Sequence, residues 1–407
     1  MNPEKSNTRN GWRWIRLGDH VAKIGSGFTP LGGHKVYQIS GIPLIRSQNV
    51  HMNRFEPDGL AFISDDQNGD MESSKVLAGD VLLNITGASI GRVCVAPTKY
   101  APANVNQHVC IIRGDGSLDS EFLSFYFASN EFQKFIMGSQ VGATRQALTK
   151  AMIENFRVPF TELNEQRRIV SRLREQMAEM ERARVAVQAQ LETAQALPAA
   201  LLRDVFDNRA SKKWPLRRLG DSLVLRKEII HPSDHPKGPA IFVGLEHIES
   251  QMGKRIGGVN VEMAELTGRK PRFRTGDIVY GYLRPYLNKV WVADFDGLCS
   301  VDQYAYSIRS EIADTGFIAW FMRSPCYLER APIGNTPGQL PRIRLEEVAA
   351  VQIGLPPLAE QRAVAKRIET EIEAFTELRE SLQTRLAEIE LLPAALLRSA
   401  FGGNTEN

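Results

Sequence analysis

The feature that most constrains the fold of this chain is a long segment that occurs twice. Residues 163–206 return without a gap as residues 358–401, at one fixed offset (358 − 163 = 195). Glu165-Gln166-Arg167 recurs as Glu360-Gln361-Arg362, and the sequence PAALLR recurs near the end of both copies. A match this specific indicates an internal duplication, so we expect two copies of one structural unit.

Both copies have the pattern of a long coiled-coil helix, because apolar residues recur at alternating steps of four and three. Pro198 and Pro393 are predicted to end the long helix and to open a short apolar one. Up to that point a straight helix would span about 50 Å, so we expect a spacer. The seam residues are Leu173, Met177, Met180, Val187, Leu191 and Ala194 in the first copy, and Ile368, Ile372, Phe375, Leu382, Leu386 and Ile389 in the second.

One seam position holds an arginine in both copies, Arg184 and Arg379. A charge inside such a seam lowers stability and is explained by register control or by an outside partner. The alternative is that each arginine lies at the seam's edge and extends its guanidinium into water.

Composition sets broad limits. A chain of 407 residues is long for one core, so two or more domains are expected. No apolar run approaches a bilayer span, and the polar start MNPEKSNTRNGW is unlike a secretory signal, which predicts a cytoplasmic protein. The four cysteines form no C-x-x-C pair, so buried thiols are expected. A net charge of +3 does not decide between partners.

The segments before the two helices read as similar β-rich domains, which open at Leu17-Gly18-Asp19 and at Leu219-Gly220-Asp221. Each has short β-like runs broken by Gly, Pro and Asn, followed by a helical stretch. The predicted domains are residues 1–160, 161–206, 207–356 and 357–407. The predicted strands are 42–45, 59–63, 80–85, 92–96 and 109–112, then 241–245, 277–282, 289–293 and 303–308; the predicted helices are 120–137, with Asp119 or Ser120 as N-cap, and about 312–328.

The two domains align at a few positions, such as Gly79-Asp80 with Gly276-Asp277, and diverge strongly between them. For example, residues 84–92 read NITGASIGR and residues 281–289 read GYLRPYLNK. A duplicated frame with different loops suits two recognition domains of different specificity, and simple drift would also produce it.

With these segments in view, the chain resembles the specificity subunit of a type I restriction–modification system. The matching stretches are Leu17-Gly18-Asp19, residues 25–30 (GSGFTP), 37–43 (YQISGIP) and 87–91 (GASIG), and the Glu-Gln-Arg start of each helix after Pro159 and after Pro356-Pro357. The resemblance implies an α+β fold in which two target recognition domains are separated by two antiparallel helices with pseudo-two-fold symmetry.

The resemblance also implies a role without catalysis. Each domain would read one half of a split, asymmetric DNA target, and partner subunits would methylate adenine or cut the DNA. The implied partners are double-stranded DNA, modification subunits, two in number, and restriction subunits; S-adenosylmethionine, ATP and Mg would belong to those subunits. Geometry fits this role, because two heads on antiparallel rods suit major-groove sites about 34 Å apart.

No catalytic motif contradicts a role limited to binding. The one Pro-Pro, Pro356-Pro357, is flanked by leucines rather than by the Asp or Asn and the aromatic residue of an amino-methyltransferase. Gly25-Ser-Gly27 lacks the Gly-Lys-Ser/Thr of a phosphate loop and reads as a turn. His231 and His235 are each followed by proline, which argues against a helical metal site. We expect no catalytic residue and no metal.

Candidate DNA contacts are polar or basic loop residues, because arginine can bind guanine edges and amides can bind adenine edges. The basic run 269–274 (RKPRFR) is either a backbone contact or a solvated loop. Glu165, Gln166, Arg167, Glu360, Gln361 and Arg362 are the candidate partner contacts. The candidate DNA contacts are Arg46, Gln48, Asn49, Asn84, Thr86, Ser89, Arg92, Thr144, Arg145 and Gln146 in the first domain, and His247, Tyr282, Arg284, Tyr286, Asn288, Lys289, Thr336, Gln339, Arg342 and Arg344 in the second.

Two other hypotheses remain open. The chain could serve a fused restriction–methylation enzyme, which this sequence hardly distinguishes from a separate complex. It could also be a coiled-coil scaffold whose β-rich domains bind proteins. A stand-alone enzyme is the weakest option.

Overall fold

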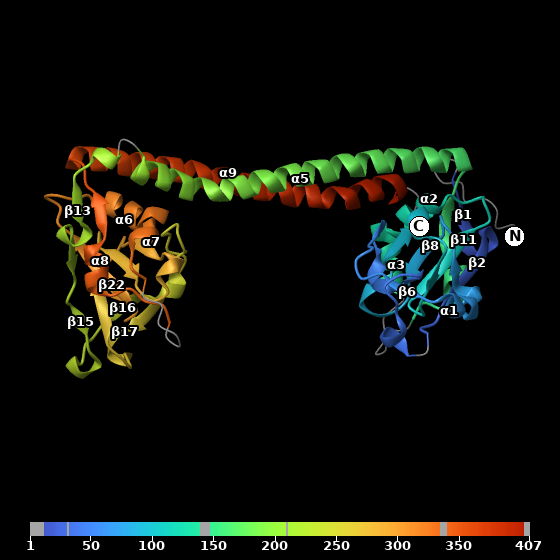
Figure 1. Cartoon of the computed structure of the whole chain (residues 1–407), viewed down its shortest axis with the longest axis horizontal. Helices are drawn as coiled ribbons and strands as arrows, with labels where there is room; N and C mark the ends of the chain where they lie inside the picture. The colour runs from blue at the N-terminus through green and yellow to red at the C-terminus, as the bar shows by residue number, and fades with distance from the viewer. Residues whose placement is uncertain (1–11, 31, 139–146, 209–210, 334–339, 403–407) are drawn as a thin grey trace. The chain divides into compact units, whose positions relative to one another are not determined.

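The computed structural model describes residues 12–30, 32–138, 147–208, 211–333 and 340–402 (Figure 1). The chain divides into two compact units: unit 1 is Met1–Val187 with Arg385–Asn407, and unit 2 is Gln188–Thr384. Each unit holds one β-rich domain and a part of both long helices, α5 (Leu163–Asp207) and α9 (Leu358–Phe401). The predicted α+β fold, with β-rich domains and long helices, is confirmed.

The domain of unit 1 has two four-stranded sheets, ordered β2-β11-β8-β9 and β6-β3-β10-β7, and two two-stranded sheets, β1-β12 and β4-β5. All the pairs are antiparallel except β3 with β10. The elements are β1 (Arg13–Arg16), β2 (Val21–Ser26), β3 (Ile42–Ile45), β4 (Val50–His51), β5 (Arg54–Phe55), β6 (Ala61–Ile63), α1 (Asp65–Asp70), β7 (Lys75–Val76), β8 (Val81–Asn84), β9 (Val93–Val95), β10 (Ala103–Val105), β11 (Val109–Gly114), α2 (Ser120–Phe127), α3 (Asn130–Gly138), α4 (Lys150–Glu154) and β12 (Arg157–Phe160).

Unit 2 repeats this frame with sheets ordered β14-β22-β19-β20, β15-β18-β21-β16-β17 and β13-β23. Its parallel pair, β16 with β21, corresponds to β3 with β10, and β15 is an added edge strand. The elements are β13 (Leu216–Arg218), β14 (Leu223–Leu225), β15 (Ile229–Ile230), β16 (Pro239–Val243), β17 (Val259–Glu262), β18 (Lys270–Phe273), β19 (Ile278–Gly281), β20 (Val290–Val292), β21 (Gly297–Cys299), β22 (Gln303–Ile308), α6 (Thr315–Arg323), α7 (Pro325–Arg330), α8 (Leu345–Ala350) and β23 (Gln352–Gly354).

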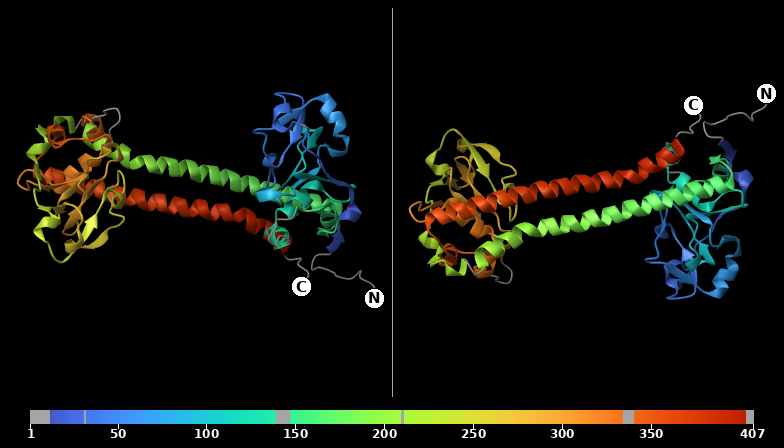
Figure 2. Two further views of the ribbon diagram at one scale, coloured as in Figure 1. Left: turned by 90° about the horizontal axis from the view of Figure 1, so that it is seen from below. Right: turned by 90° about the horizontal axis from the view of Figure 1, so that it is seen from above.

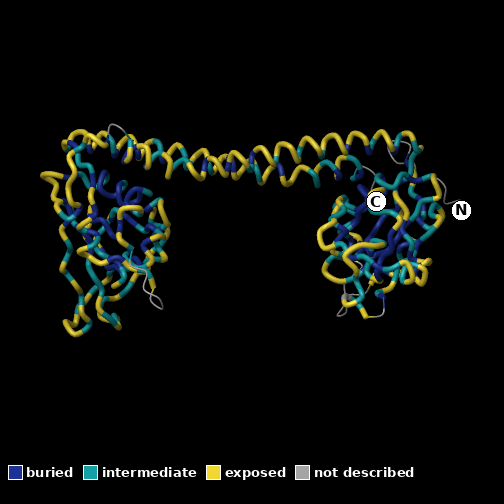
Figure 3. The backbone as a smooth tube through the Cα atoms, in the orientation of Figure 1, coloured by how far each residue is buried: buried dark blue, intermediate teal, exposed yellow. Residues whose placement is uncertain are grey.

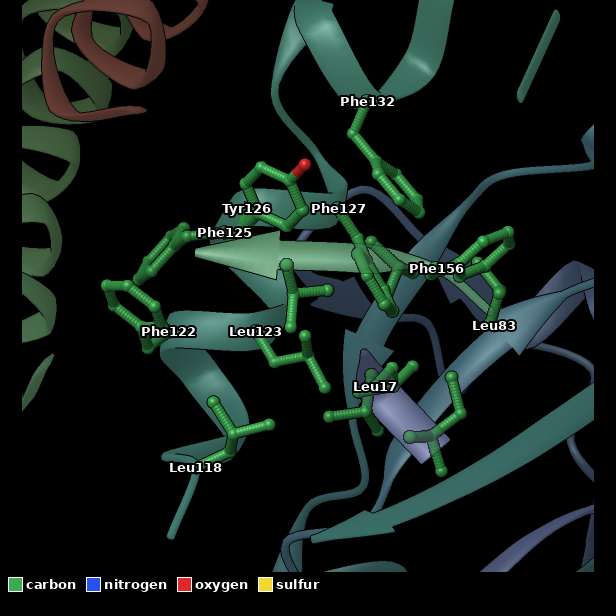
Figure 4. Close-up of a cluster of buried hydrophobic side chains, with 14 of the residues drawn as sticks. Leu17, Leu83, Leu118, Phe122, Leu123, Phe125, Tyr126, Phe127, Phe132 and Phe156 are labelled. Atoms are coloured by element: carbon green, nitrogen blue, oxygen red, sulfur yellow. The ribbon is translucent and has the colours of Figure 1, made fainter. Parts of the chain in front are cut away.

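The central strands are buried on both faces, because their side chains alternate between two cores. In β8, Val81 and Leu83 face the helices while Leu82 faces the second sheet. In β19, Ile278 and Tyr280 likewise face the helices, while Val279 faces the second sheet. Figure 4 shows the helix-side core of unit 1, where Leu83 and Leu17 meet the aromatic residues of α2. This core carries the loops at the strand ends.

The end of each long helix is fixed by an aromatic residue in a domain core. In unit 1, Phe401 of α9 packs edge-on against Phe122 at 5.4 Å, next to the first turns of α5 (Figure 2). In unit 2, Phe206 of α5 makes the same contact with Phe317, also at 5.4 Å. Since 401 − 206 and 317 − 122 both equal 195, the duplication preserved this contact and, with it, the repeated PAALLR segment.

The prediction that Pro198 and Pro393 end the long helices is wrong, because both prolines lie inside continuous helices. An internal proline removes one backbone hydrogen bond and strains the preceding turn. Burial of Leu202 and Phe206, and of Leu397 and Phe401, in the domain cores opposes that cost. Packing at the helix end therefore overrides the local signal for a break.

The predicted seams are confirmed. Eight of the twelve seam residues are buried and the other four are partly buried, while most of the remaining surface of both helices is exposed (Figure 3). The buried eight are Leu173, Val187, Leu191, Ala194, Ile368, Ile372, Leu382 and Ile389. None of the described helices is both long and apolar enough to cross a lipid bilayer.

The two predicted single helices, 120–137 and 312–328, are each split in two. Ser129 lies between α2 and α3, and its hydroxyl accepts from the N–H of Phe132 at 3.4 Å. Ser324 caps α7, and Pro325 occupies its first turn. The strands predicted at 42–45 and 303–308 are confirmed to the residue. The strand predicted at 241–245 has the predicted length but lies two residues earlier, and the others overlap observed strands of different length. The expected buried thiols are also confirmed, since all four cysteines are buried and free.

Candidate nucleic-acid interface

In unit 1, loops at one end of the sheet β2-β11-β8-β9 line an open hollow of about 430 Å³. Two of the segments follow β8 and precede β11, which are paired strands of this sheet, and the third follows β3 of the other four-stranded sheet. Four predicted DNA contacts, Gln48, Thr86, Ser89 and Arg92, lie in its lining, and Gln48 is exposed. The full lining is Ser47, Gln48, Thr86, Gly87, Ala88, Ser89, Arg92 and His108.

His108 is a member of this hollow that was not among the predicted contacts. Its Nδ1 lies 2.6 Å from Oγ1 of Thr86, and its Nε2 lies 3.2 Å from Nε2 of Gln107. A row of imidazole, hydroxyl and amide groups can donate to and accept from base edges. The signal in the sequence was the alignment of Asn106-Gln107-His108 with Asp302-Gln303-Tyr304, which marked this position only as part of the frame.

Three other predicted contacts in unit 1 shape the loops from within. Asn49 and Asn84 are fully buried, and their amide nitrogens donate to the carbonyls of Glu56 at 2.8 Å and Ser47 at 2.9 Å. The guanidinium of Arg46 donates to the carbonyl of Gly59 and lies over the ring of Tyr37. These hydrogen bonds hold the turn that presents Gln48.

In unit 2, the loop of residues 281–289 keeps the backbone of residues 84–92 but changes its side chains. Gly87 and Gly91 have φ of +71° and +86°, and the corresponding Arg284 and Asn288 have φ of +51° and +48°. Residues with a Cβ are strained in this left-handed region by about 1 kcal/mol or more. Strain of this kind is commonly retained at functional sites.

Arg284 lies in an exposed basic and aromatic cluster. Its N–H donates to the carbonyl of Pro341 at 2.7 Å, and the adjacent Leu283 forms a β-bridge with Arg342, so the two loops are neighbours. Tyr282 stacks on Tyr304 with ring centres 4.4 Å apart. Burial raises the pKa of Tyr282, and the positive charges of Arg342 and Arg269 act in the opposite direction. The exposed members are Arg284, Tyr286, Arg342 and Arg344.

The other predicted contacts of unit 2 have internal roles. Nδ1 of His247 accepts from the N–H of Gly244 at 3.0 Å, and Nζ of Lys289 donates to the carbonyl of Leu245 at 2.6 Å. Asn288 is 1% exposed, and its amide donates to the carbonyl of Arg323 at 2.8 Å. Thr144, Arg145, Gln146, Thr336 and Gln339 lie outside the described residues.

Comparison with known proteins finds one family model and several relatives that are similar to this chain. The family described as "Type I restriction modification DNA specificity domain" matches residues 10–190. The EcoDI specificity subunit of Escherichia coli is 31% identical over 190 residues, which are 47% of this chain and 42% of that protein, so the match spans less than half of the relative. The EcoKI specificity subunit of E. coli K12 is 19% identical over 89% of this chain and 82% of its own length. Residues 10–190 thus match the family model, and the chain is similar to these type I specificity subunits.

Solved structures agree on the fold of this chain. A chain from a structure titled for complex assembly and conformational transition of the type I restriction–modification system has a TM-score of 0.73 at 19% identity, covering 98% of this chain and 99% of its own. The HsdS subunit from Thermoanaerobacter tengcongensis has a TM-score of 0.69 at 18% identity, with both chains fully covered. The resemblance inferred from the sequence motifs is confirmed.

The repeated Glu-Gln-Arg of this chain has an internal cause at its central residue. Gln166 is fully buried; its Oε1 accepts from the N–H of Asp119 at 2.8 Å, and its Nε2 donates to the carbonyls of Ser117 at 3.1 Å and Thr161 at 2.8 Å. In unit 2, Gln361 makes the same three bonds with Asp314, Ile312 and Pro356, all 195 positions further on. We call this set the glutamine clamp. It ties the first turn of each long helix to a domain.

The flanking residues of the two Glu-Gln-Arg triplets are closer to solvent. Glu165 pairs with Arg168 at 2.8 Å, and the hydrogen bond from Arg168 lowers the pKa of Glu165. Glu360 accepts from the indole N–H of Trp214 at 3.0 Å. Arg167 and Arg362 are exposed, and neither has an ion pair with another described residue. Glu360 is exposed as well, so these two cations are the exposed members of the triplets that have no ion pair within the described chain.

The basic run 269–274 is not a solvated loop but mostly the strand β18, anchored by the buried Phe273. Arg272 and Arg274 pair with Glu228 at 3.0 and 3.1 Å, which leaves less of their charge for DNA. Arg269 lies outside the strand, near Tyr282. Within the described ranges, no three His, Cys, Asp or Glu side chains gather as a metal site.

Proposed function

We propose that this chain is the noncatalytic DNA-binding subunit of a type I restriction–modification complex. Each unit reads one half of a split, asymmetric double-stranded target through the loops that follow β8 and β19. Modification subunits, two in number, methylate adenine in the recognised site, and restriction subunits cut the DNA. S-adenosylmethionine, ATP and Mg bind to those subunits.

One observation carries this proposal: the same loop backbone appears in both units with different side chains. Gly87 and Gly91 are matched in conformation by Arg284 and Asn288, so the loop geometry was kept while its chemistry changed. Unit 1 presents imidazole, hydroxyl and amide groups around Arg92, and unit 2 presents arginines beside stacked tyrosines. Two different half-sites require this combination of a constant frame and altered surfaces.

Mapping methylated adenines in DNA from cells that carry this chain with its partner subunits tests the proposal. The expected result is one bipartite motif. Arg92→Ala should relax the sequence preference in one half of that motif and Arg284→Ala in the other half, because each side chain belongs to a different unit. Arg217→Ala is the control, since Arg217 is exposed on β13, which pairs with β23 and not with the sheet that carries the loop after β19.

Three outcomes would count against the proposal. A continuous motif would argue against two half-sites. Equal loss of methylation at all sites in both variants would assign the arginines to phosphate contacts. If the purified complex does not protect DNA at all, the coiled-coil scaffold becomes the better hypothesis.

Assembly with the modification subunits is tested separately. Arg167→Glu with Arg362→Glu reverses two exposed charges at the starts of the long helices without touching the glutamine clamp. The double variant should co-purify with less modification subunit than the unaltered chain, while its thermal unfolding stays the same. Unchanged co-purification would exclude these arginines as partner contacts. Stable assembly with a separate restriction subunit would also distinguish this system from a fused enzyme.

A further inference from the structure

Unit 2 contains a cavity of about 470 Å³ whose lining combines two arginines with apolar side chains. It lies among the end of α5, the middle of α9, the junction of α6 and α7, and residues 249–252. Leu202, Leu328, Met252 and Phe375 supply apolar walls. This volume lies within the usual range for small-molecule sites, which is about 300–1,000 Å³.

Arg323, at the end of α6, is a buried cation that lines this cavity. Its side chain is 9% exposed, its Nε donates to the carbonyl of Val290 at 3.0 Å, and its guanidinium lies 4.5 Å from the ring of Trp320. Neither Nη atom has a hydrogen bond or an ion pair with another described residue. Burial lowers the pKa of Arg323 to about 10, which still leaves it charged at neutral pH.

The backbone around Arg323 is shaped to hold the guanidinium in place. Gly253 has φ of +65°, and a Cβ there would lie 2.2 Å from both Nε of Arg323 and the carbonyl oxygen of Val290. Asn288, also left-handed, binds the carbonyl of Arg323, and its own Oδ1 is buried in the cavity lining without a partner in the described chain. Burying a charge without a counter-charge and burying an amide oxygen without a hydrogen bond are both costly in a folded protein.

Arg379 supplies the second positive charge, and its counterpart in unit 1 shows what is missing. Arg184, 195 positions earlier, pairs with Glu181 at 2.8 Å on the same helix. The position that matches Glu181 is Thr376, so Arg379 has no such carboxylate, and both Thr376 and Arg379 line the cavity. Residues 91 and 128 of unit 1, which match Asn288 and Arg323, are Gly and Ala. Only unit 2 therefore has this pair of cations.

We propose that this cavity binds a small organic oxyanion, a carboxylate or phosphate monoester with an apolar body. The oxyanion lies between Arg323 and Arg379, and the apolar body contacts Leu202, Leu328 and Phe375. Glu249 also lines the cavity, so two arginines and one carboxylate leave a net charge of +1, which matches one anionic group. The bound molecule joins α9 to the domain of unit 2. This inference does not depend on DNA recognition.

The test uses the full chain labelled with 5-fluorotryptophan and phenyl phosphate as the probe. The fluorine signal of Trp320, assigned by its loss in Trp320→Phe, should shift in a saturable way, and calorimetry should give the same affinity. Inorganic phosphate should bind more weakly, because it lacks the apolar body, and benzyl alcohol should not bind. Inorganic phosphate binding as tightly as phenyl phosphate would overturn the apolar part of the proposal.

Two variants test the role of Arg379. Arg379→Gln removes one charge, and Thr376→Glu supplies the carboxylate that Arg184 has in unit 1; each should weaken binding about tenfold, the typical contribution of one charge-assisted hydrogen bond. Arg184→Gln is the matched control and should leave the affinity unchanged. Absence of saturable binding in the unaltered chain, or equal affinity in all three variants, would overturn the proposal.

Discussion

Replacing Gln166 by methionine tests whether the glutamine clamp holds a long helix to its domain. Methionine has a similar volume and helix propensity, so the substitution removes the amide with little change in packing. It leaves the N–H of Asp119 and the carbonyls of Ser117 and Thr161 without the partner they have in the folded chain. Gln166 is fully buried, so water does not easily replace the lost bonds.

The magnitude follows from the number of bonds. Three hydrogen bonds at about 1 kcal/mol each give a loss of about 3 kcal/mol in the free energy of unfolding. For a unit of about 200 residues, that loss lowers the melting temperature by about 6–12 °C. Gln361→Met should cost a similar amount in unit 2, because its three bonds have nearly the same lengths.

Urea unfolding and calorimetry of the full chain measure these losses, and hydrogen exchange assigns each one to a unit. Exchange should rise at the start of α5 and at Asp119 in Gln166→Met, and at the start of α9 and at Asp314 in Gln361→Met. Arg167→Met, at the exposed neighbouring position, is the control and should change stability by less than about 0.5 kcal/mol. A loss below about 1 kcal/mol in both glutamine variants would refute the clamp as a major tie.

Three further predictions concern the frame and its loops. Arg284→Gly should raise the free energy of unfolding of unit 2 by up to about 1 kcal/mol, because glycine tolerates φ of +51°. The same change should weaken DNA binding. A loss of stability in urea unfolding would contradict the strain argument. Asp80→Asn breaks the two-bond ion pair between buried Asp80 and Arg113 and should lower the free energy of unfolding by about 2–3 kcal/mol. Asp19→Asn, in the exposed pair with Arg16, should lower it by less than about 1 kcal/mol. Equal losses in the two variants would contradict the role of burial. Burial raises the pKa of Cys94, Cys110 and Cys299 to about 12 and also raises the pKa of Cys326. A thiol reagent at pH 8 should therefore label the native protein slowly and should label all four cysteines after denaturation. Rapid labelling of any cysteine in the native protein would contradict its burial.

The long-range organisation of this chain was predictable because the duplication and the heptad seam are repeated signals. Each seam position is supported by its neighbours three and four residues away, so one unusual residue such as Arg184 does not hide the pattern. Strand positions were also predictable, since buried apolar runs alternate with Gly and Asn. The strand ends differed because they depend on pairing partners, which a single sequence does not reveal.

Two kinds of error had opposite physical causes. At Pro198 a strong local signal for a helix end was overridden by the packing of Phe206 in the core of unit 2. At Ser129 and Ser324 a single cap residue decided the structure, because each serine hydroxyl caps a new helix inside an apolar run. Apolar periodicity outweighed the cap residues in the prediction, although serine is a strong helix start.

The candidate contacts were harder to predict, because a polar side chain on a loop can either form hydrogen bonds with the loop backbone or contact a ligand. Asn49 and Asn84 have the amides expected of adenine readers, and the structure uses both amides to hold loop backbone. His108 was hidden for the opposite reason, since it aligns with the frame and yet faces the hollow beside Thr86. Only the fold distinguishes an amide that builds a loop from one that the loop presents.

The pairs of Asp80 and Asp277 show what the duplication preserved. Both acids are buried and accept a backbone N–H three residues earlier, at Leu77 and Arg274. Arg113 of β11 neutralises the first, and Arg226, which follows β14, neutralises the second. In the repeated frame β14 corresponds to β2, and β2 pairs antiparallel with β11 as β14 pairs with β22. Either strand of this pair can therefore bring a guanidinium to the same carboxylate. The two units therefore share the neutralised carboxylate and differ in the position of its partner. The loops after β8 and β19 follow the same rule, since they share a left-handed backbone and differ in their side chains.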